Sequence, residues 1–417
     1  HHWDKLPLNW QISLEDLNPI QIAELLDYEA PMKGKMWPLS LLALKSILVT
    51  TSLPRRMVNL NIESPCFTKD EKLLKLFWKN VKAKKRHEIL IMSKICYQSA
   101  NATNCFYIVD IGSGLGHLSR ILNYGYGFKV CTIEAQELLS HQAKKLDHEF
   151  EKILEKKYRG CLNYHRTVHI NEKIQSNITV EEFLMIIKNA FNIDHDDFKF
   201  GIVGLHPCGD LGATLLKLYN KCSKARYINI VGCCYMKLST ASTELTQGFP
   251  LSQLCKINKY QLSYHSREIA CHAIENYIEK LLKGEFWRLQ IHTYRAVLEK
   301  LITNKYPDYH HCALNNVKYT EDLTFVNYCK KAVKKLKITF PEDQLSNEEI
   351  EKLLLQWKKV VVFYSLRLLF APLIETIIHF DRFLYVEELK SDSTVTPVFD
   401  SRISPRNHVL TAVKKVH

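Results

Sequence analysis

A glycine-rich turn directly follows an acidic residue in the segment Asp110-Ile-Gly-Ser-Gly-Leu-Gly116. Glycine lets the backbone come close to a ligand, and the helix expected after the turn presents free N–H groups at its first residues. The carboxylate of Asp110 can accept hydrogen bonds within the turn and from an amine on a bound ligand. This arrangement predicts a pocket for a small cofactor.

A second acidic residue, Glu134, ends the next apolar run, where an acid can accept both hydroxyls of a ribose. The turn differs from the Gly-x-Gly-x-x-Gly of dinucleotide-binding folds, and its Gly-x-Gly-x-Gly form is typical of methyltransferases. We therefore expect S-adenosylmethionine as the cofactor; the alternatives are an NAD site and a tight turn that binds nothing. The residues expected to contact the cofactor are Asp110, Gly112, Ser113, Gly114, Gly116, His117, Leu118, Glu134, Leu205 and His206.

Two unusual segments follow later apolar runs, residues 204–210 (Gly-Leu-His-Pro-Cys-Gly-Asp) and residues 232–237 (Gly-Cys-Cys-Tyr-Met-Lys). They supply four candidate catalytic residues: His206, Cys208, Asp210 and Tyr235. His206 could deprotonate a hydroxyl or amine acceptor. The dipeptide ending at Cys208 is similar to the Pro-Cys of cytosine C5-methyltransferases, whose thiolate attacks the base. In the alternative interpretation, His206 and Cys208 only shape the wall of the site.

Two further patterns are missing from these segments. The Asn/Asp-Pro-Pro-Tyr sequence of N6-adenine methyltransferases is absent, which argues against amino-group methylation by the mechanism that this motif serves. Six residues could suggest zinc but lack the paired Cys-x-x-Cys spacing of structural sites, so we expect no metal. They are Cys208, Cys233, Cys234, His265, Cys271 and His272.

The 13 cysteines form no regular framework, and free thiols favour a reducing compartment, the cytosol or the nucleus.

The balance of charge favours a polyanionic acceptor. Lysine and arginine exceed aspartate and glutamate by 57 to 44, which gives a net charge of +13, and such an excess favours RNA. The candidate substrate contacts are Lys84, Lys85, Arg86, His87, Cys233, Cys234 and Lys237. The basic run could instead be a solvated helix face. For the whole chain, the alternatives are a protein acceptor and a catalytically inactive scaffold that binds the cofactor.

Glycine placement shows which elements must position these residues. Twelve of the 14 glycines lie between Gly112 and Gly248, so we expect an α/β region there and mainly helices on either side. The expected strands are residues 105–111, 128–134, 199–205 and 227–233, with a weaker one within 162–170. The expected helices between them are residues 117–123, 135–158 and 211–222. This alternation predicts a parallel, doubly wound sheet whose strand ends carry the candidate residues.

The flanks complete the expected organisation. Residues 1–85 are expected to form an N-terminal helical region with helices at 14–28, 37–51 and 70–85, and residues 86–239 the first part of the core. Residues 240–353 are expected to be a helical insertion, and residues 354–417 a long helix (354–389) and a closing strand pair (394–399 and 408–413). The apolar run 360–380 holds Arg367, Pro372, Glu375 and His379, so we expect a buried helix and no transmembrane segment.

Several strings in this order carry a resemblance to a known family. They are Lys84-Lys-Arg-His-Glu88, the glycine turn, Leu205-His-Pro-Cys-Gly-Asp-Leu211, Val231-Gly-Cys-Cys-Tyr-Met-Lys-Leu-Ser239, Gly248-Phe-Pro-Leu-Ser252 and Ser404-Pro-Arg-Asn407. The chain resembles the methyltransferase-like protein 25 family, in particular its 25B branch, from residue 37 to the C-terminus. The resemblance implies a class I, Rossmann-like methyltransferase fold with a mostly parallel seven-stranded sheet, and S-adenosylmethionine as cofactor. A weaker likeness to tRNA 2′-O-methyltransferases, which carry His-x-Cys-Gly and Cys-Cys turns, favours RNA as acceptor.

Overall fold

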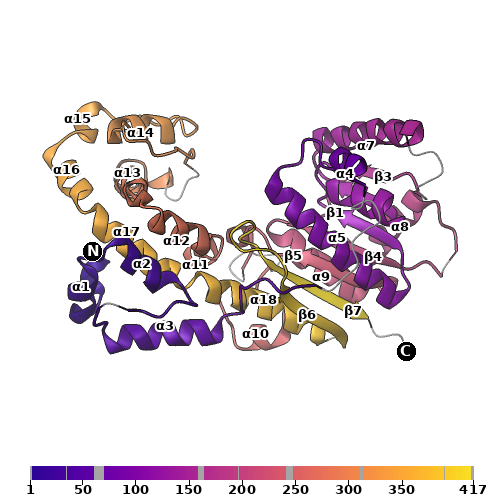
Figure 1. The fold of residues 1–417 in the computed structure, drawn as a ribbon, viewed down its shortest axis with the longest axis horizontal. Coiled ribbons are helices and arrows are strands. Elements are labelled where there is room, and N and C mark those ends of the chain that lie inside the picture. Colours follow the sequence, from indigo (N-terminus) through magenta and orange to yellow (C-terminus); the bar gives the residue numbers. More distant parts are fainter. Residues whose placement is uncertain are drawn as a thin grey trace. The chain divides into compact units, whose positions relative to one another are not determined.

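The computed structural model describes residues 2–33, 35–60, 70–157, 164–195, 197–240, 248–309, 314–388 and 390–414 (Figure 1). The chain divides into two compact units. A helical unit combines His1–Ser52 with Ala273–Ala371, and a sheet unit combines Leu53–His272 with Pro372–His417. Each unit is therefore built from segments that are far apart in the sequence.

The sheet unit contains a seven-stranded sheet of order β3-β2-β1-β4-β5-β7-β6. Its strands are β1 (Tyr107–Ile111), β2 (Lys129–Glu134), β3 (Val168–Asn171), β4 (Phe200–Leu205), β5 (Ala225–Val231), β6 (Ser391–Pro397) and β7 (His408–Lys414). The first five pair in parallel, while β7 pairs antiparallel with both β5 and β6. This confirms the expected class I, Rossmann-like fold with its closing strand pair.

Helices cover both faces of this sheet, because successive side chains of a strand point to opposite faces. Ile108 of β1 packs with Ile89 and Met92 of α5 (Ala83–Thr103) on one face. Its neighbour Val109 packs with Phe183 of α8 (Val180–Phe191) on the other. The remaining helices of the sheet unit are α4 (Glu71–Phe77), α6 (His117–Arg120), α7 (Glu137–Lys157), α9 (Asp210–Lys221), α10 (Gln253–Ile257), α11 (Tyr264–Ile269) and α18 (Ala371–Glu387).

The helical unit has its own core. Leu298 of α13 (Ile291–Lys305), Tyr328 of α14 (Phe325–Ala332) and Ile350 of α16 (Glu348–Leu355) belong to one buried cluster. The other helices are α1 (Leu8–Leu14), α2 (Pro19–Leu26), α3 (Leu39–Thr51), α12 (Ile274–Leu282), α15 (Glu342–Leu345) and α17 (Trp357–Leu368). A separate core explains why this part forms a compact unit.

The boundaries of these units differ from the expected domains. Residues 53–85 and 240–272 belong to the sheet unit, and residues 354–371 belong to the helical unit. Leu73 and Phe77 of α4 explain the first difference, because they are buried in the same cluster as α5. The expected helix 14–28 corresponds to the shorter α2, with α1 lying before it, and the expected helix 70–85 is divided by the boundary between α4 and α5.

The expected helix 354–389 is also divided, with α17 ending before α18 begins at Ala371. Pro372 explains the break, since proline fits the first turn of a helix but removes a backbone hydrogen bond from the turn before it. By length and composition, the stretch Trp357–Glu387 could cross a membrane, yet 67% of its most apolar window is buried within the protein. Soluble core helices pass the same test, and the burial agrees with the expectation of a buried helix.

Candidate functional site

A cavity of about 500 Å³ opens at the carboxyl ends of β1 and β4, within the size range of small-molecule sites. Eight of the ten residues expected to contact the cofactor line it: Asp110, Gly112, Ser113, Gly114, His117, Leu118, Leu205 and His206. The start of α5 and the residues before it supply a second wall, made of Asn80, Val81, Lys82, Lys84, Lys85, Glu88 and Ile89. The carboxyl edge of a parallel sheet is where this fold class places its ligands.

The glycine turn adopts a backbone that other residues rarely accept. Gly112, Gly114 and Gly116 all have φ between +58° and +72°, in the left-handed region that favours glycine. Glu134 holds the turn in place, since its Oε2 accepts a 2.9 Å hydrogen bond from the Gly114 N–H and its Oε1 one from the Gln136 N–H. Gly116 and Glu134 are the two expected cofactor contacts that do not line the cavity. The structure thus shows Glu134 bound to the backbone of the turn.

Asp110 is the buried acid of the cavity, with 2% of its surface exposed. Its Oδ2 accepts a 2.5 Å hydrogen bond from Ser119 Oγ at the start of α6. Burial raises the pKa of Asp110 to about 6, and the hydrogen bond from Ser119 opposes this only in part. A ligand that brings a positive charge would favour the ionised carboxylate.

Glu88 and His206 form a pair across the cavity wall. His206 Nε2 donates to Glu88 Oε1 at 2.9 Å, and Ser404 Oγ donates to the same oxygen at 2.6 Å. Burial by itself raises the pKa of Glu88, but the hydrogen bonds from His206 and Ser404 and the charge of Lys85 outweigh it and lower the pKa to about 2. Glu88 is therefore an ionised carboxylate that fixes the orientation of the imidazole.

Two polar atoms of the cavity lining have no partner among the described residues. They are Ser113 Oγ and His206 Nδ1, both buried. Buried polar atoms are nearly always hydrogen-bonded, so such atoms in a cavity wall indicate the positions of ligand groups. S-adenosylmethionine, with its amine, carboxylate and ribose hydroxyls, fits this donor and acceptor set beside Asp110.

The four consecutive basic residues 84–87, which were expected to contact the substrate, do not share one surface in the structure. Lys84 and Lys85 line the cavity, and their Nζ atoms lie 3.8 Å and 3.6 Å from the Glu88 carboxylate. Arg86 does not line the cavity and instead donates to the carbonyls of Val81 and Trp78. His87 Nε2 accepts from the Asp400 N–H, again outside the cavity. The expected phosphate contact of this run stays a prediction, because Arg86 and His87 lie outside the cavity and Arg86 belongs to a different surface.

That surface is a groove of about 810 Å³ along α4. Its lining includes the cations Lys72, Lys75, Lys79 and Arg86, the indole of Trp78 and one acid, Glu71. Asn80 lines both this groove and the cofactor cavity. The sequence analysis missed the three lysines, although their spacing of three and four residues within an expected helix would place them on one face.

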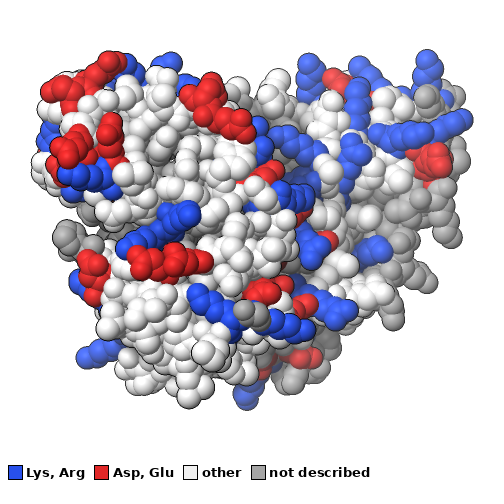
Figure 2. Space-filling view, turned by 60° about the vertical axis from the view of Figure 1, so that its left-hand side comes forward, with Lys and Arg blue, Asp and Glu red and all other residues white. Residues whose placement is uncertain are grey.

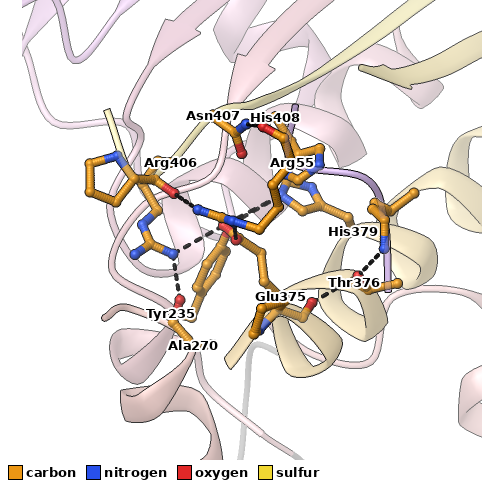
Figure 3. A network of polar contacts seen from close by, with 12 residues as sticks. Arg55, Tyr235, Ala270, Glu375, Thr376, His379, Arg406, Asn407 and His408 are labelled. Atoms are coloured by element: carbon orange, nitrogen blue, oxygen red, sulfur yellow. Dashed lines mark hydrogen bonds and ion pairs between the residues drawn. The ribbon is translucent and has the colours of Figure 1, made fainter. Parts of the chain in front are cut away.

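Tyr235 is not available to a substrate, so its expected catalytic role is wrong. It is 1% exposed, and its hydroxyl donates a 2.8 Å hydrogen bond to Glu375 Oε1. Figure 3 shows the buried carboxylate of Glu375 at the centre of a network that also contains Arg55 (2.6 Å) and Arg406 (3.0 Å). The network ties the segment after β5 to α18 and to the loop before β7, so Tyr235 positions residues rather than reacting.

Asp210 also has a structural task. Its Oδ1 accepts a 2.8 Å hydrogen bond from the Ser239 N–H, which joins the loop after β4 to the loop after β5. The candidates Cys208, Cys233 and Cys234 come together at this junction, outside the cavity lining. Hydrogen bonding with the other two thiols, first with Cys233, lowers the pKa of Cys208. Lys237 is exposed near them. His206 thus remains the candidate base of the cavity, and Glu88 is the partner that the sequence analysis missed.

The comparisons with known proteins agree with this arrangement. Residues 84–241 match a family model described as a methyltransferase domain. The chain is 31% identical to the human "Probable methyltransferase-like protein 25" over 230 residues, which cover 51% of this chain and 37% of that protein. The mouse protein of the same name is 29% identical over 229 residues. The matched part thus spans well under half the length of these curated relatives.

Among solved structures, an S-adenosylmethionine-dependent methyltransferase from Clostridium acetobutylicum is 16% identical. The superposition covers 40% of this chain and 59% of the other, with a TM-score of 0.24. The fold assignment therefore rests on the strand order and on the matched domain. The chain is similar to methyltransferase-like protein 25, its residues 84–241 match a methyltransferase domain, and its seven-stranded sheet has the strand order of a class I methyltransferase fold.

Proposed function

We propose that this chain transfers a methyl group from S-adenosylmethionine to a hydroxyl of RNA, with His206 as the general base. The observation that carries the proposal is the Glu88–His206 pair in the wall of the cofactor cavity. The cofactor supplies an electrophilic methyl group, and the protein has to hold the cofactor, admit the acceptor and remove one proton.

The residues of the glycine turn and Asp110 would hold the cofactor. The turn lets the backbone approach the ligand closely, and its three glycines keep that approach free of side chains. Asp110 supplies a negative charge for the amine or the sulfonium of the ligand. Ser113 Oγ, which lacks a partner among the described residues, is free to bond a polar group of the ligand.

The Glu88–His206 pair has the arrangement of a base and the group that orients it. Because the ionised Glu88 accepts the Nε2 proton, the other ring nitrogen, Nδ1, carries the lone pair. That nitrogen is buried and has no partner among the described residues, and its residue lines the cavity. It can take the proton of an acceptor hydroxyl while Glu88 stabilises the charged ring.

The groove along α4 supports RNA as the acceptor. Lys72, Lys75, Lys79 and Arg86 can contact phosphates, and Trp78 offers a face for a base to stack on. The net charge alone selects no surface, because Figure 2 shows acidic and basic side chains intermingled over much of the face in view. The groove differs in that its cations outnumber its single acid and that it shares Asn80 with the cofactor cavity.

The first experiment is a calorimetric titration of S-adenosylhomocysteine into the wild type, Asp110→Asn and Asp194→Asn. Asp194 is an exposed residue of the sheet unit and serves as the matched control. We expect micromolar binding, about −8 kcal/mol, for the wild type and the control. Loss of about 1–3 kcal/mol is expected for Asp110→Asn, because a carboxylate that bonds the ligand is removed. Absence of binding by the wild type would disprove the proposed activity.

The acceptor is tested by transfer of a labelled methyl group to total RNA and to a protein fraction. We expect label in RNA that nuclease removes and protease does not, and its loss in His206→Asn. Label that only protease removes would instead identify a protein acceptor. Cofactor binding without methyl transfer to either fraction would instead support the alternative that the chain is a catalytically inactive scaffold.

A further inference from the structure

Three thiols from two separate loops meet at the carboxyl edge of the sheet. Cys208 Sγ lies 3.5 Å from Cys233 Sγ and 3.5 Å from Cys234 Sγ, and the last two are 3.6 Å apart. The two loops start side by side because β4 and β5 are parallel neighbours, with Leu205 opposite Val231. The sequence predicts no metal at these cysteines because they lack the Cys-x-x-Cys spacing, whereas the pairing of β4 with β5 brings the three together.

The exposure of these cysteines does not fit a role in packing. Among the described free cysteines, six are buried, as expected for a small apolar side chain: Cys96, Cys105, Cys131, Cys222, Cys255 and Cys329. Cys208 is exposed, and Cys233 and Cys234 are partly exposed. The three thiols therefore remain accessible to an ion from solvent.

Both loops are held rigidly around the thiols. Asp210, two residues after Cys208, is bonded to the Ser239 N–H. A side chain at Gly209 would place its Cβ 3.0 Å from the Lys237 carbonyl oxygen, and one at Gly232 would place it 2.2 Å from the Tyr235 hydroxyl oxygen. The two loops therefore touch at Gly209, and the loop after β5 folds closely on itself at Gly232, so a side chain at either position would have to displace its neighbours. Such support fixes the sulfur positions before a ligand arrives.

We propose that Cys208, Cys233 and Cys234 bind a zinc ion. Tetrahedral zinc has Zn–S bonds of about 2.3 Å, which separate the sulfur atoms by roughly 3.8 Å, so the observed triangle needs only a slight expansion. Among the described residues, the cluster contains these three ligands and no fourth. The exposure of Cys208 leaves the fourth position to water or another small ligand, as in catalytic rather than structural zinc sites.

The surrounding charges suit three thiolates. The positive charge of the Lys237 ammonium favours the thiolate form of Cys208, and the buried guanidinium of Arg382 interacts in the same way with Cys233. A second group of possible ligands, Glu375, His379 and His408, differs in this respect. There the carboxylate is already paired with two guanidinium groups, which would repel a cation. The thiol cluster is therefore the site that the structure favours.

The test measures metal binding by the whole reduced chain without S-adenosylmethionine, so it does not depend on the proposed methyl transfer. Cobalt(II) is titrated first, because thiolate ligands give it an intense charge-transfer absorption, and zinc(II) is then used to displace it. The variants are Cys208→Ser and Cys234→Ser, with Cys271→Ser as control. Cys271 is partly exposed and bonds to Met236 and the Arg267 carbonyl outside the triangle.

We expect the wild type and Cys271→Ser to bind zinc equally, and each ligand variant to lose at least about tenfold in affinity. Zinc should also protect Cys208 of the wild type from alkylation, a readout that needs no variant to fold. Binding by Cys208→Ser as tight as that of the wild type would overturn the proposal. So would failure of the reduced wild type to take up either metal, with Cys208 recovered in a disulfide with Cys233 or Cys234.

Discussion

Glu88 Oε1 lies 2.9 Å from His206 Nε2, although the two residues are 118 positions apart in the chain. The carboxylate is on α5, which covers one face of the sheet, and the histidine follows β4. Ser404, in the loop before β7, donates to the same oxygen. Three segments therefore converge on one carboxylate, which leaves Nδ1 of the imidazole as the only ring nitrogen that can accept a proton.

Replacing His206 with asparagine should lower the rate of methyl transfer by about 10²–10⁴-fold, the usual contribution of a general base. Glu88→Gln should cause a smaller loss, since the amide can still accept from Nε2 but cannot stabilise the charged ring. Single-turnover rates at saturating cofactor measure both effects. Calorimetry with S-adenosylhomocysteine is the control, and a loss of affinity as large as the loss of rate would contradict a role in proton transfer.

Asp110 should make cofactor binding depend on pH. Burial raises its pKa to about 6, so the free protein carries a neutral carboxyl group below that pH. A ligand with a positive charge prefers the ionised form, and its affinity should therefore fall as the pH decreases through about 6. Titrations of S-adenosylhomocysteine at several pH values measure this dependence. Asp110→Asn should bind the ligand more weakly, and its affinity should no longer depend on pH in this range. An unchanged pH dependence in this variant would mean that another group causes it.

The local parts of the site could be predicted from the sequence. The glycine turn and the buried strands depend on residues that are close in the chain, and the structure confirms the turn at Gly112 and the strands on either side of it. A signal for α8 was also present, because Thr179 and Glu182 form a capping box at its start. No helix was expected over these residues, although the capping box marks its start.

The remaining parts of the site depend on contacts between distant segments. The Glu88–His206 pair and the three thiols exist only after β4 has paired with β5 and α5 has packed on the sheet. Tyr235 shows the opposite case, in which the sequence predicts a catalytic role that the structure contradicts. Its neighbours in the sequence suggest chemistry, but its hydroxyl is bonded to Glu375 of α18, a contact that sequence spacing does not reveal.

Charge reversal in the groove along α4 should weaken RNA binding and its dependence on salt. The double variant Lys75→Glu/Lys79→Glu removes two possible phosphate contacts, so the slope of log K against log salt should decrease by about 1–2. Fluorescence anisotropy with labelled single-stranded RNA at several salt concentrations measures this slope. Lys318→Glu/Lys335→Glu, a double reversal at exposed positions in the helical unit, is the control because it changes the net charge by the same amount. Equal effects of control and groove variants would show that only the net charge matters.

Glu375 should be among the most costly residues to replace in the sheet unit. Its buried carboxylate accepts from Tyr235 and pairs with Arg55 and Arg406, so Glu375→Gln leaves two guanidinium groups without their counter-ion. Removing one partner of a buried ion pair costs about 3–5 kcal/mol. The exposed pair Glu279–Lys283 is the control, where Glu279→Gln should change the free energy of unfolding far less because solvent screens the pair. Urea unfolding at neutral pH measures both free energies.

The loss should also depend on pH with a definite sign. Burial by itself raises the pKa of Glu375, but Arg406 and Arg55 lower it to about 2, below its ordinary value of 4.5. The stability that the ionised carboxylate contributes is therefore present above pH 4.5 and is lost as the pH falls toward 2. The difference in unfolding free energy between wild type and Glu375→Gln should shrink over this range. A difference that stays constant would mean that the carboxylate acts through its shape and hydrogen bonds rather than through its charge.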